Sequence, residues 1–173
     1  MSKKKRVLII AGSLFVVFLL FFIFGTPEYR AMKIKNENFG TLETRLKDAC
    51  TTKDQVNIAE EANFSWDECY VFPPYYPSKK VYESVGEEWT SAKTFIEYIM
   101  FHNVENEVHS EGQYLIVFKS NNKVVLSKIY NLRDMPIVFN LKDNKFTKDK
   151  AKFSIKSSDK YGISEVKELT PVS

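Results

Sequence analysis

The stretch Gln113–Tyr130, QYLIVFKSNNKVVLSKIY, decides the fold of this chain. Its first half, Tyr114–Phe118 (YLIVF), is apolar throughout, as expected for a strand that is covered on both faces. The polar residues Ser120–Lys123 (SNNK) are typical of a hairpin turn, and Val124–Tyr130 follows as the partner strand. The sequence therefore predicts an antiparallel hairpin with a central, fully buried first strand.

Upstream of the hairpin, residues 66–72 (WDECYVF) predict another strand. Its large aromatic side chains would share one face, because alternate residues of a strand point the same way: Trp66, Tyr70 and Phe72. Pro73 ends this strand, since proline lacks the amide donor that a sheet requires. Ser78 can then cap a short helix over 78–85, and Gly86 suits the left-handed residue at its end.

Three further segments carry structural signals. Residues 39–49 place their apolar side chains on one helical face, which predicts a helix. Residues 90–104 (TSAKTFIEYIMFHNV) suit a helix or a buried strand, and we interpret them as helix. Residues 150–156 alternate lysines with apolar residues, which predicts a half-exposed strand, the last of the chain.

These elements combine into an α+β domain over 39–173. We expect a mainly antiparallel sheet, with the helices 39–49 and 78–85 on one of its faces, built from 66–72, 113–119, 124–131 and 150–156. The core is expected to include Trp66, Tyr70, Phe72, Leu115, Val117, Ile129, Phe153 and Ile155.

The segment WDECYVFPPYYPSKKVYESVGEEW (66–89) resembles part of a family of small membrane-anchored or lipoprotein-like proteins of Gram-positive bacteria. In that family an aromatic-Asp strand precedes a Pro-Tyr loop and a short helix. The hairpin is similar too, so the likeness covers about 60–131. The family is uncharacterised, and the resemblance therefore implies a location but no activity.

The N-terminus carries a membrane signal. Val7–Phe24 (VLIIAGSLFVVFLLFFIF) holds no charge, and as a helix it would be about 27 Å long, enough to cross a bilayer core. The basic flank 1–6, with Lys3 to Arg6, favours the cytoplasmic side. We expect a single-pass signal-anchor over 7–25, a juxtamembrane linker over 26–38 and an extracytoplasmic domain.

A cleaved secretory signal is the alternative to this anchor. It would need a shorter apolar run and a small-x-small cleavage site, and Phe24-Gly25-Thr26-Pro27 offers no good pair of small residues.

The charge balance excludes one class of partner. The chain has 25 Lys plus Arg against 22 Asp plus Glu, but four of the basic residues lie in the N-terminal flank. The remaining 148 residues (26–173) are nearly neutral, whereas nucleic-acid binding needs a concentrated basic face. We expect no nucleic-acid partner.

Candidate binding residues lie in two places. Tyr75 and Tyr76 in the proline loop could present aromatic rings to a ligand, or they could simply pack over the following helix. Lys150, Lys152 and Lys156 would form a cationic row that attracts anionic wall polymers or headgroups, or that only keeps the strand soluble.

Two cysteines and two histidines remain. Cys50 and Cys69 could form a disulfide in an extracytoplasmic compartment, or they could be buried free thiols. His102 and His109 lie among glutamates, but their spacing matches no known ligand pattern, so we expect a solvated acidic surface without metal or cofactor. Asp67 beside Trp66 is the carboxylate that we single out, with a solvated charge at the strand edge as its expected role.

No nucleophile, base and orienting group stand in a recognisable catalytic pattern. The sequence therefore favours a non-catalytic, membrane-tethered module that binds an envelope protein or an anionic envelope polymer. An inhibitor or immunity-type protein is the alternative. A cell-envelope enzyme is a further one, which would need a pocket that gathers His102, His109 or Asp67 with other polar groups.

Overall fold

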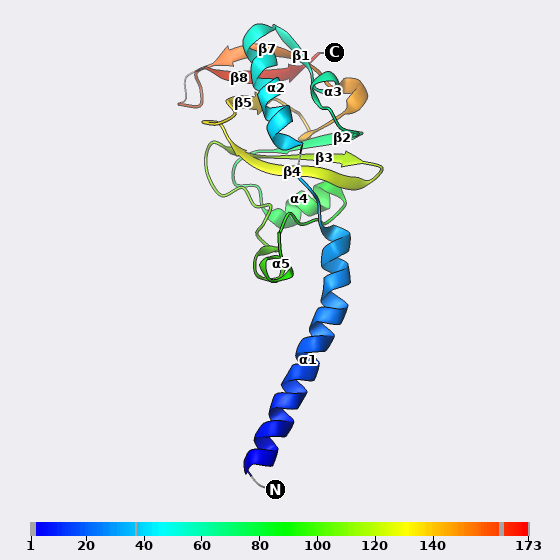
Figure 1. Ribbon diagram of the computed structural model, residues 1–173. Helices are drawn as coiled ribbons and strands as arrows, with labels where there is room; N and C mark the ends of the chain where they lie inside the picture. The colour runs from blue at the N-terminus through cyan, green and yellow to red at the C-terminus, as the bar shows by residue number, and fades with distance from the viewer. Residues whose placement is uncertain (1–2, 37, 163–164, 173) are drawn as a thin grey trace.

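The computed structural model describes residues 3–36, 38–162 and 165–172, and it has a long apolar helix followed by an α+β domain, as predicted (Figure 1). The helices are α1 (Lys3–Met32), α2 (Phe39–Thr52), α3 (Ile58–Glu61), α4 (Ser78–Val85) and α5 (Phe95–Phe101). The strands are β1 (Gln55–Asn57), β2 (Glu68–Phe72), β3 (Gln113–Ser120), β4 (Lys123–Asn131), β5 (Ile137–Phe139), β6 (Lys145–Thr147), β7 (Lys152–Ser158) and β8 (Val166–Pro171).

The predicted hairpin is confirmed and lies in a four-stranded antiparallel sheet of order β4-β3-β2-β6. Its turn residues Asn121 and Asn122 both have positive φ, of 50° and 61°, as in the tight turns that match the twist of a hairpin. β3 is buried on both faces. Leu115 and Val117 face one core, and Ile116 and Phe118 face another.

The two cores occupy the two sides of this sheet. The larger core lies between it and a second sheet of order β1-β7-β8-β5, and α2 contributes Leu42 and Leu46 there. The smaller core lies between β2, β3 and α4, which contributes Val81 and Val85. Figure 1 accordingly shows α4 below the β2–β4 strands and the β7–β8 strands above them.

This layering corrects two predictions. The helices 39–49 and 78–85 were expected on one face of a single sheet, but α2 and α4 pack on opposite faces of the hairpin sheet. Trp66 was expected to share a face with Tyr70 and Phe72, but it lies in the larger core, whereas they lie in the smaller one. The physical reason is that β2 begins only at Glu68, so strand alternation does not extend back to Trp66.

The C-terminal region differs from the prediction as well. The strand expected over 150–156 begins at Lys152, and it is not the last, because β8 pairs with it in antiparallel register and with β5 in parallel register. Ile129 and Ile155 are partly buried against the cores, and the other six predicted core residues are fully buried.

The expected linker over 26–38 is largely ordered against the domain. Residues 26–32 continue α1. The chain then forms a short parallel β-bridge with Thr90, in the segment before α5: Ile34 N donates to Thr90 O at 2.9 Å, and Thr90 N donates to Met32 O at 2.9 Å. Asn36 Oδ1 then accepts from Ser127 N of β4 at 2.9 Å. The long helix is therefore attached to the domain by backbone hydrogen bonds rather than by a free tether.

Candidate binding groove

The two tyrosines of the proline loop after β2 have different environments. Tyr76 is half-buried on Phe72, with ring centroids 4.8 Å apart, and its carbonyl accepts from Val108 N at 3.2 Å. Tyr75 is 64% exposed and has a φ of 63°, a backbone region that bulky residues rarely adopt. Because such strained conformations concentrate at functional sites, Tyr75 is the stronger binding candidate of the pair.

Tyr75 lies at an open pocket of about 480 Å³, which we call the tyrosine groove. Segments far apart in the sequence build it: the proline loop, the turn before β3, the segment after β4 and the β7–β8 connection. Its lining residues are Pro74, Tyr75, Glu111, Gly112, Tyr114, Leu132, Lys160 and Tyr161.

Two of the three groove tyrosines have fixed positions. Tyr114 stacks on Tyr130 across β3 and β4 with ring centroids 5.9 Å apart, and Tyr130 Oη donates to Ile137 O at 3.0 Å. Tyr161 Oη donates to Glu168 Oε1 at 3.2 Å. Burial and the neighbouring Glu168 carboxylate raise the pKa of Tyr161 to about 12, so its phenol stays neutral. The groove therefore offers preorganised aromatic walls with one exposed ring, Tyr75, at its rim.

Charged groups of both signs surround these rings. Lys160 and Glu111 line the groove, and Lys160 Nζ lies 3.5 Å from Glu168 Oε1. An adjoining pocket of about 440 Å³ shares Glu111, Gly112 and Tyr161 with the groove and adds Arg133. Tyrosine and arginine in one concave surface match the composition of protein–protein interfaces.

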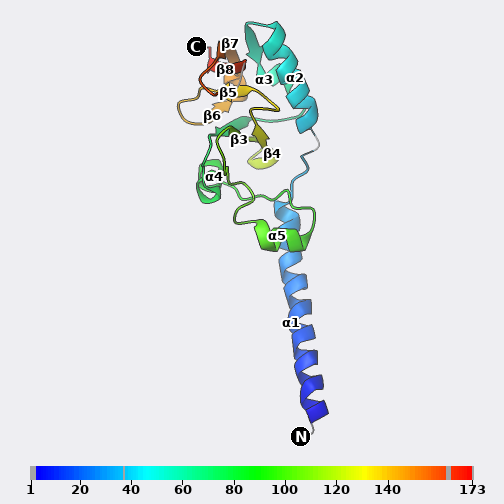
Figure 2. The same cartoon turned by 90° about the vertical axis from the view of Figure 1, so that its left-hand side faces the viewer.

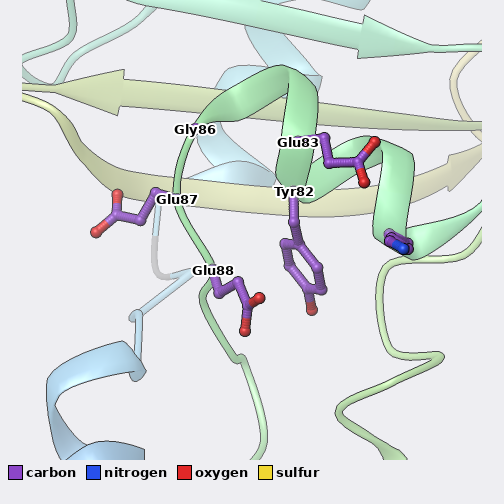
Figure 3. A pocket seen from close by; sticks show the side chains of 6 residues that line it. Tyr82, Glu83, Gly86, Glu87 and Glu88 are labelled. Atoms are coloured by element: carbon purple, nitrogen blue, oxygen red, sulfur yellow. The ribbon is translucent and has the colours of Figure 1, made fainter.

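A separate pocket of about 370 Å³ lies at the end of α4 (Figure 3). Its lining residues are Lys79, Tyr82, Glu83, Gly86, Glu87 and Glu88. Its carboxylates do not converge. Glu87 points away from Tyr82 and Glu88 in Figure 3, and it pairs with Lys123 at 2.6 Å and accepts from Val124 N at 2.7 Å. These contacts join the end of α4 to the hairpin. We therefore assign Glu87 a structural role in this pocket, which we call the acidic pocket.

The histidines do not form a common site. His102 lies between the rings of Tyr82 and Tyr98 and contacts Glu88 at 3.4 Å, whereas His109 contacts Glu107 at 3.9 Å. Over the described residues, no three His, Cys, Asp or Glu side chains gather in a way that could hold a metal ion.

Asp67 has a structural role at the hairpin. Its Oδ2 accepts from Asn121 N at 2.6 Å, and its own N donates to Lys119 O at 2.7 Å, so it fixes the turn between β3 and β4. Neither the tyrosine groove nor the acidic pocket is lined by His102, His109 or Asp67.

Next to Asp67, Glu68 forms a charged cluster that joins several elements. Its carboxylate contacts Lys145 of β6, Lys119 of β3 at 3.8 Å and Tyr70 Oη at 3.0 Å. The hydrogen bond from Lys145, followed by those from Tyr70 and the lysine charges, lowers the pKa of Glu68 against its partial burial. Lys119 is buried and donates to Val85 O at 2.7 Å, which caps the end of α4.

The lysine row is interrupted. Lys150 belongs to a 3₁₀ turn (Lys148–Lys150), and only Lys152 and Lys156 lie exposed on β7. Lys156 is paired in register with Glu168 of β8, which places a carboxylate beside the row. The β7–β8 strands also lie at the end of the domain opposite to α1 (Figures 1 and 2), far from any membrane that α1 would cross.

Both cysteines are buried in the larger core as free thiols. Burial raises the pKa of Cys50 to about 11 and that of Cys69 well above its usual value. Of the two alternatives left open by the sequence, the structure has the buried thiols, and these are protonated and poorly reactive near neutral pH.

The sequence singled out Tyr75 as a binding candidate but gave no indication of the other residues that line the groove. Tyr114 reads as an ordinary strand residue, and Tyr161 lies in a polar connection with no periodic signal. Comparison of the chain with family models, with curated proteins and with solved structures gave no match. The resemblance to Gram-positive membrane-anchored proteins therefore stays a prediction.

Proposed function

We propose that this protein is a non-catalytic module, held in a membrane by α1 with its domain on the extracytoplasmic side, that binds a partner protein through the tyrosine groove. α1 is the one helix in the described part of the chain that is long and apolar enough to cross a membrane. The basic residues Lys3 to Arg6 in the first turn of α1 support a cytoplasmic N-terminus.

The observation that carries the binding role is the assembly of Tyr75, Tyr114 and Tyr161 from distant segments around one open groove. Tyrosine provides a large contact area at little cost in conformational entropy, and the rigid positions of Tyr114 and Tyr161 reduce that cost further. The mixed charges of Glu111, Lys160 and Arg133 suit a polypeptide better than a uniformly anionic wall polymer. An inhibitor or immunity-type protein is the alternative function. In that case the partner bound by the open groove would be the enzyme or toxin that this protein inhibits.

We expect the groove to cross-link to its partner. A photoreactive phenylalanine in place of Tyr75, in the full-length chain in its native membrane, should give a specific adduct upon irradiation. Lys160→Glu at the rim should reduce that adduct several-fold, because it reverses a charge that faces the partner. Lys142→Glu is the matched control, since Lys142 is exposed and lines neither groove nor acidic pocket.

With the partner identified by this adduct, Tyr75→Ser should weaken its binding about tenfold, the loss typical of an interface anchor. The groove would be excluded as the binding site if the photoreactive group gave the same adduct from Lys79 on α4, or if Lys160→Glu and Lys142→Glu behaved alike.

A further inference from the structure

The domain leaves an apolar patch exposed next to α1. Apart from Tyr75 and Val172, every large apolar side chain that the described part of the domain exposes lies between residues 96 and 104, with 46% to 66% of its surface open. These side chains, which we call the α5 patch, are Ile96, Ile99, Met100, Phe101 and Val104. A contiguous apolar surface of this kind normally marks a contact with a protein or a membrane.

α5 packs directly on α1. The Phe95 ring lies 5.4 Å from the Phe22 ring and 5.9 Å from the Tyr29 ring, and a Cβ on Gly25 would overlap it. One turn further along α5, Tyr98 Oη contacts Met32 Sδ at 3.5 Å. A larger residue at position 25 would therefore have to displace the Phe95 ring from α1.

The contact reaches into the membrane-spanning part of α1. The apolar run Val7–Phe24 ends at Phe24, so Phe22 lies about 3 Å inside that end along the helix axis. If the run fills the hydrocarbon core, Phe95 lies at the boundary between acyl chains and headgroups. Both views show α5 as the domain element that reaches furthest along α1 toward its N-terminus (Figures 1 and 2).

Polar groups around α5 are arranged as at a membrane interface. The rings of Tyr29 and Tyr98 contact each other with centroids 5.6 Å apart, and membrane proteins concentrate tyrosine at the interface level. Lys33 Nζ donates to Tyr29 Oη at 2.7 Å and to Lys93 O at 2.9 Å, which holds the Lys33 cation beside Tyr29. Glu97 accepts from Lys93 N at 2.8 Å and so is held at the start of α5.

We propose that α5 is an interfacial helix, and that the α5 patch inserts among the lipids of the leaflet on the domain's side of the membrane. Lipid is the occupant because the patch is continuous with the surface of α1 that already faces the bilayer. Insertion together with the backbone pairing at Thr90 would hold the domain at a fixed height and orientation. The inference rests on α1 spanning the membrane, but it does not depend on what the tyrosine groove binds.

The test uses spin labels on the full-length protein in vesicles of phosphatidylcholine and phosphatidylglycerol. Single cysteines carry the label at Met100 in the patch, at Phe15 in α1 and at Lys79 on α4, all of which are exposed. Oxygen enters the acyl region whereas a polar nickel complex stays in water. The ratio of oxygen to nickel accessibility at Met100 should therefore be roughly tenfold above that at Lys79, and below that at Phe15, which lies near the middle of the apolar run.

Three other outcomes would each contradict a different part of the proposal. A Met100 label that is open to nickel, with the Phe15 label still embedded, would overturn the interfacial helix and leave the anchor intact. A Met100 label that neither reagent reaches would mean that protein covers the patch, for example a second copy, and would also overturn lipid insertion. Nickel access at Phe15 would show that the anchoring itself is wrong.

Discussion

Replacing Val117 by Asp should destabilise the domain by about 4 kcal/mol, a large part of the roughly 5 to 15 kcal/mol by which a folded domain is usually stable. Val117 is fully buried in the middle of β3, and it faces α4 in the smaller core. A carboxylate there would enter the apolar cluster that contains Val81, Val85 and Phe72, where a buried charge is costly.

The measurement is urea unfolding of the full-length protein in detergent micelles, followed by fluorescence of the buried Trp66 and Trp89, which report on the two cores. Lys128→Asp introduces the same side chain at an exposed position of the neighbouring strand, and it should change the free energy of unfolding little. Equal unfolding midpoints for the two variants would contradict the central position of β3.

Trp66→Ala should cost about 3 to 5 kcal/mol, because it opens a cavity in the larger core. The Trp66 ring packs edge-on against Phe118 at 5.2 Å and Phe146 at 5.9 Å. Its Nε1 is buried without a hydrogen-bond partner among the described residues. Trp66→Phe keeps an aromatic ring there and removes this unpaired donor, so it should cost only about 1 kcal/mol.

For these two variants Trp89 remains as the fluorescent probe of unfolding. A Trp66→Phe variant as unstable as Trp66→Ala would mean that the Nε1–H has a partner and that the indole is held by a polar contact rather than by packing.

Local signals explain which parts of the fold were predictable. The hairpin, α2 and α4 were recoverable because each has its own pattern: a two-sided apolar run, a helical face, or a left-handed Gly86 with φ of 75° at the helix end. β8 was missed because VKELTP is short and polar, and its place depends on pairing with β5 and β7. The sequence of a single strand does not show with which distant strand it pairs.

The ambiguity of residues 90–104 has a physical cause. α5 occupies Phe95–Phe101, but its apolar side chains do not follow a single buried stripe, because only Phe95 is buried. The helical pattern is blurred because one side of α5 meets α1 while apolar side chains on other sides remain exposed.

The candidate groove was predictable only in part. The local composition of the proline loop singled out Tyr75, but the groove exists only because the fold brings Tyr114 and Tyr161 beside it. The interruption of the lysine row could not be predicted for a similar reason. Its alternation suggested one charged face, whereas the 3₁₀ turn at Lys150 and the pairing of Lys156 with Glu168 became visible only in three dimensions.

The central claim is that α1 crosses a membrane and displays the domain with its groove outside the cell. Labelling of single engineered cysteines with a membrane-impermeant maleimide, in intact cells that express the full-length chain, tests it directly. Cys50 and Cys69 are buried and should stay unlabelled in the folded protein. We predict that Lys142→Cys is labelled in intact cells, and that Lys4→Cys is labelled only after permeabilisation. Labelling of Lys4→Cys but not of Lys142→Cys in intact cells, or recovery of the domain free in the medium, would contradict the account.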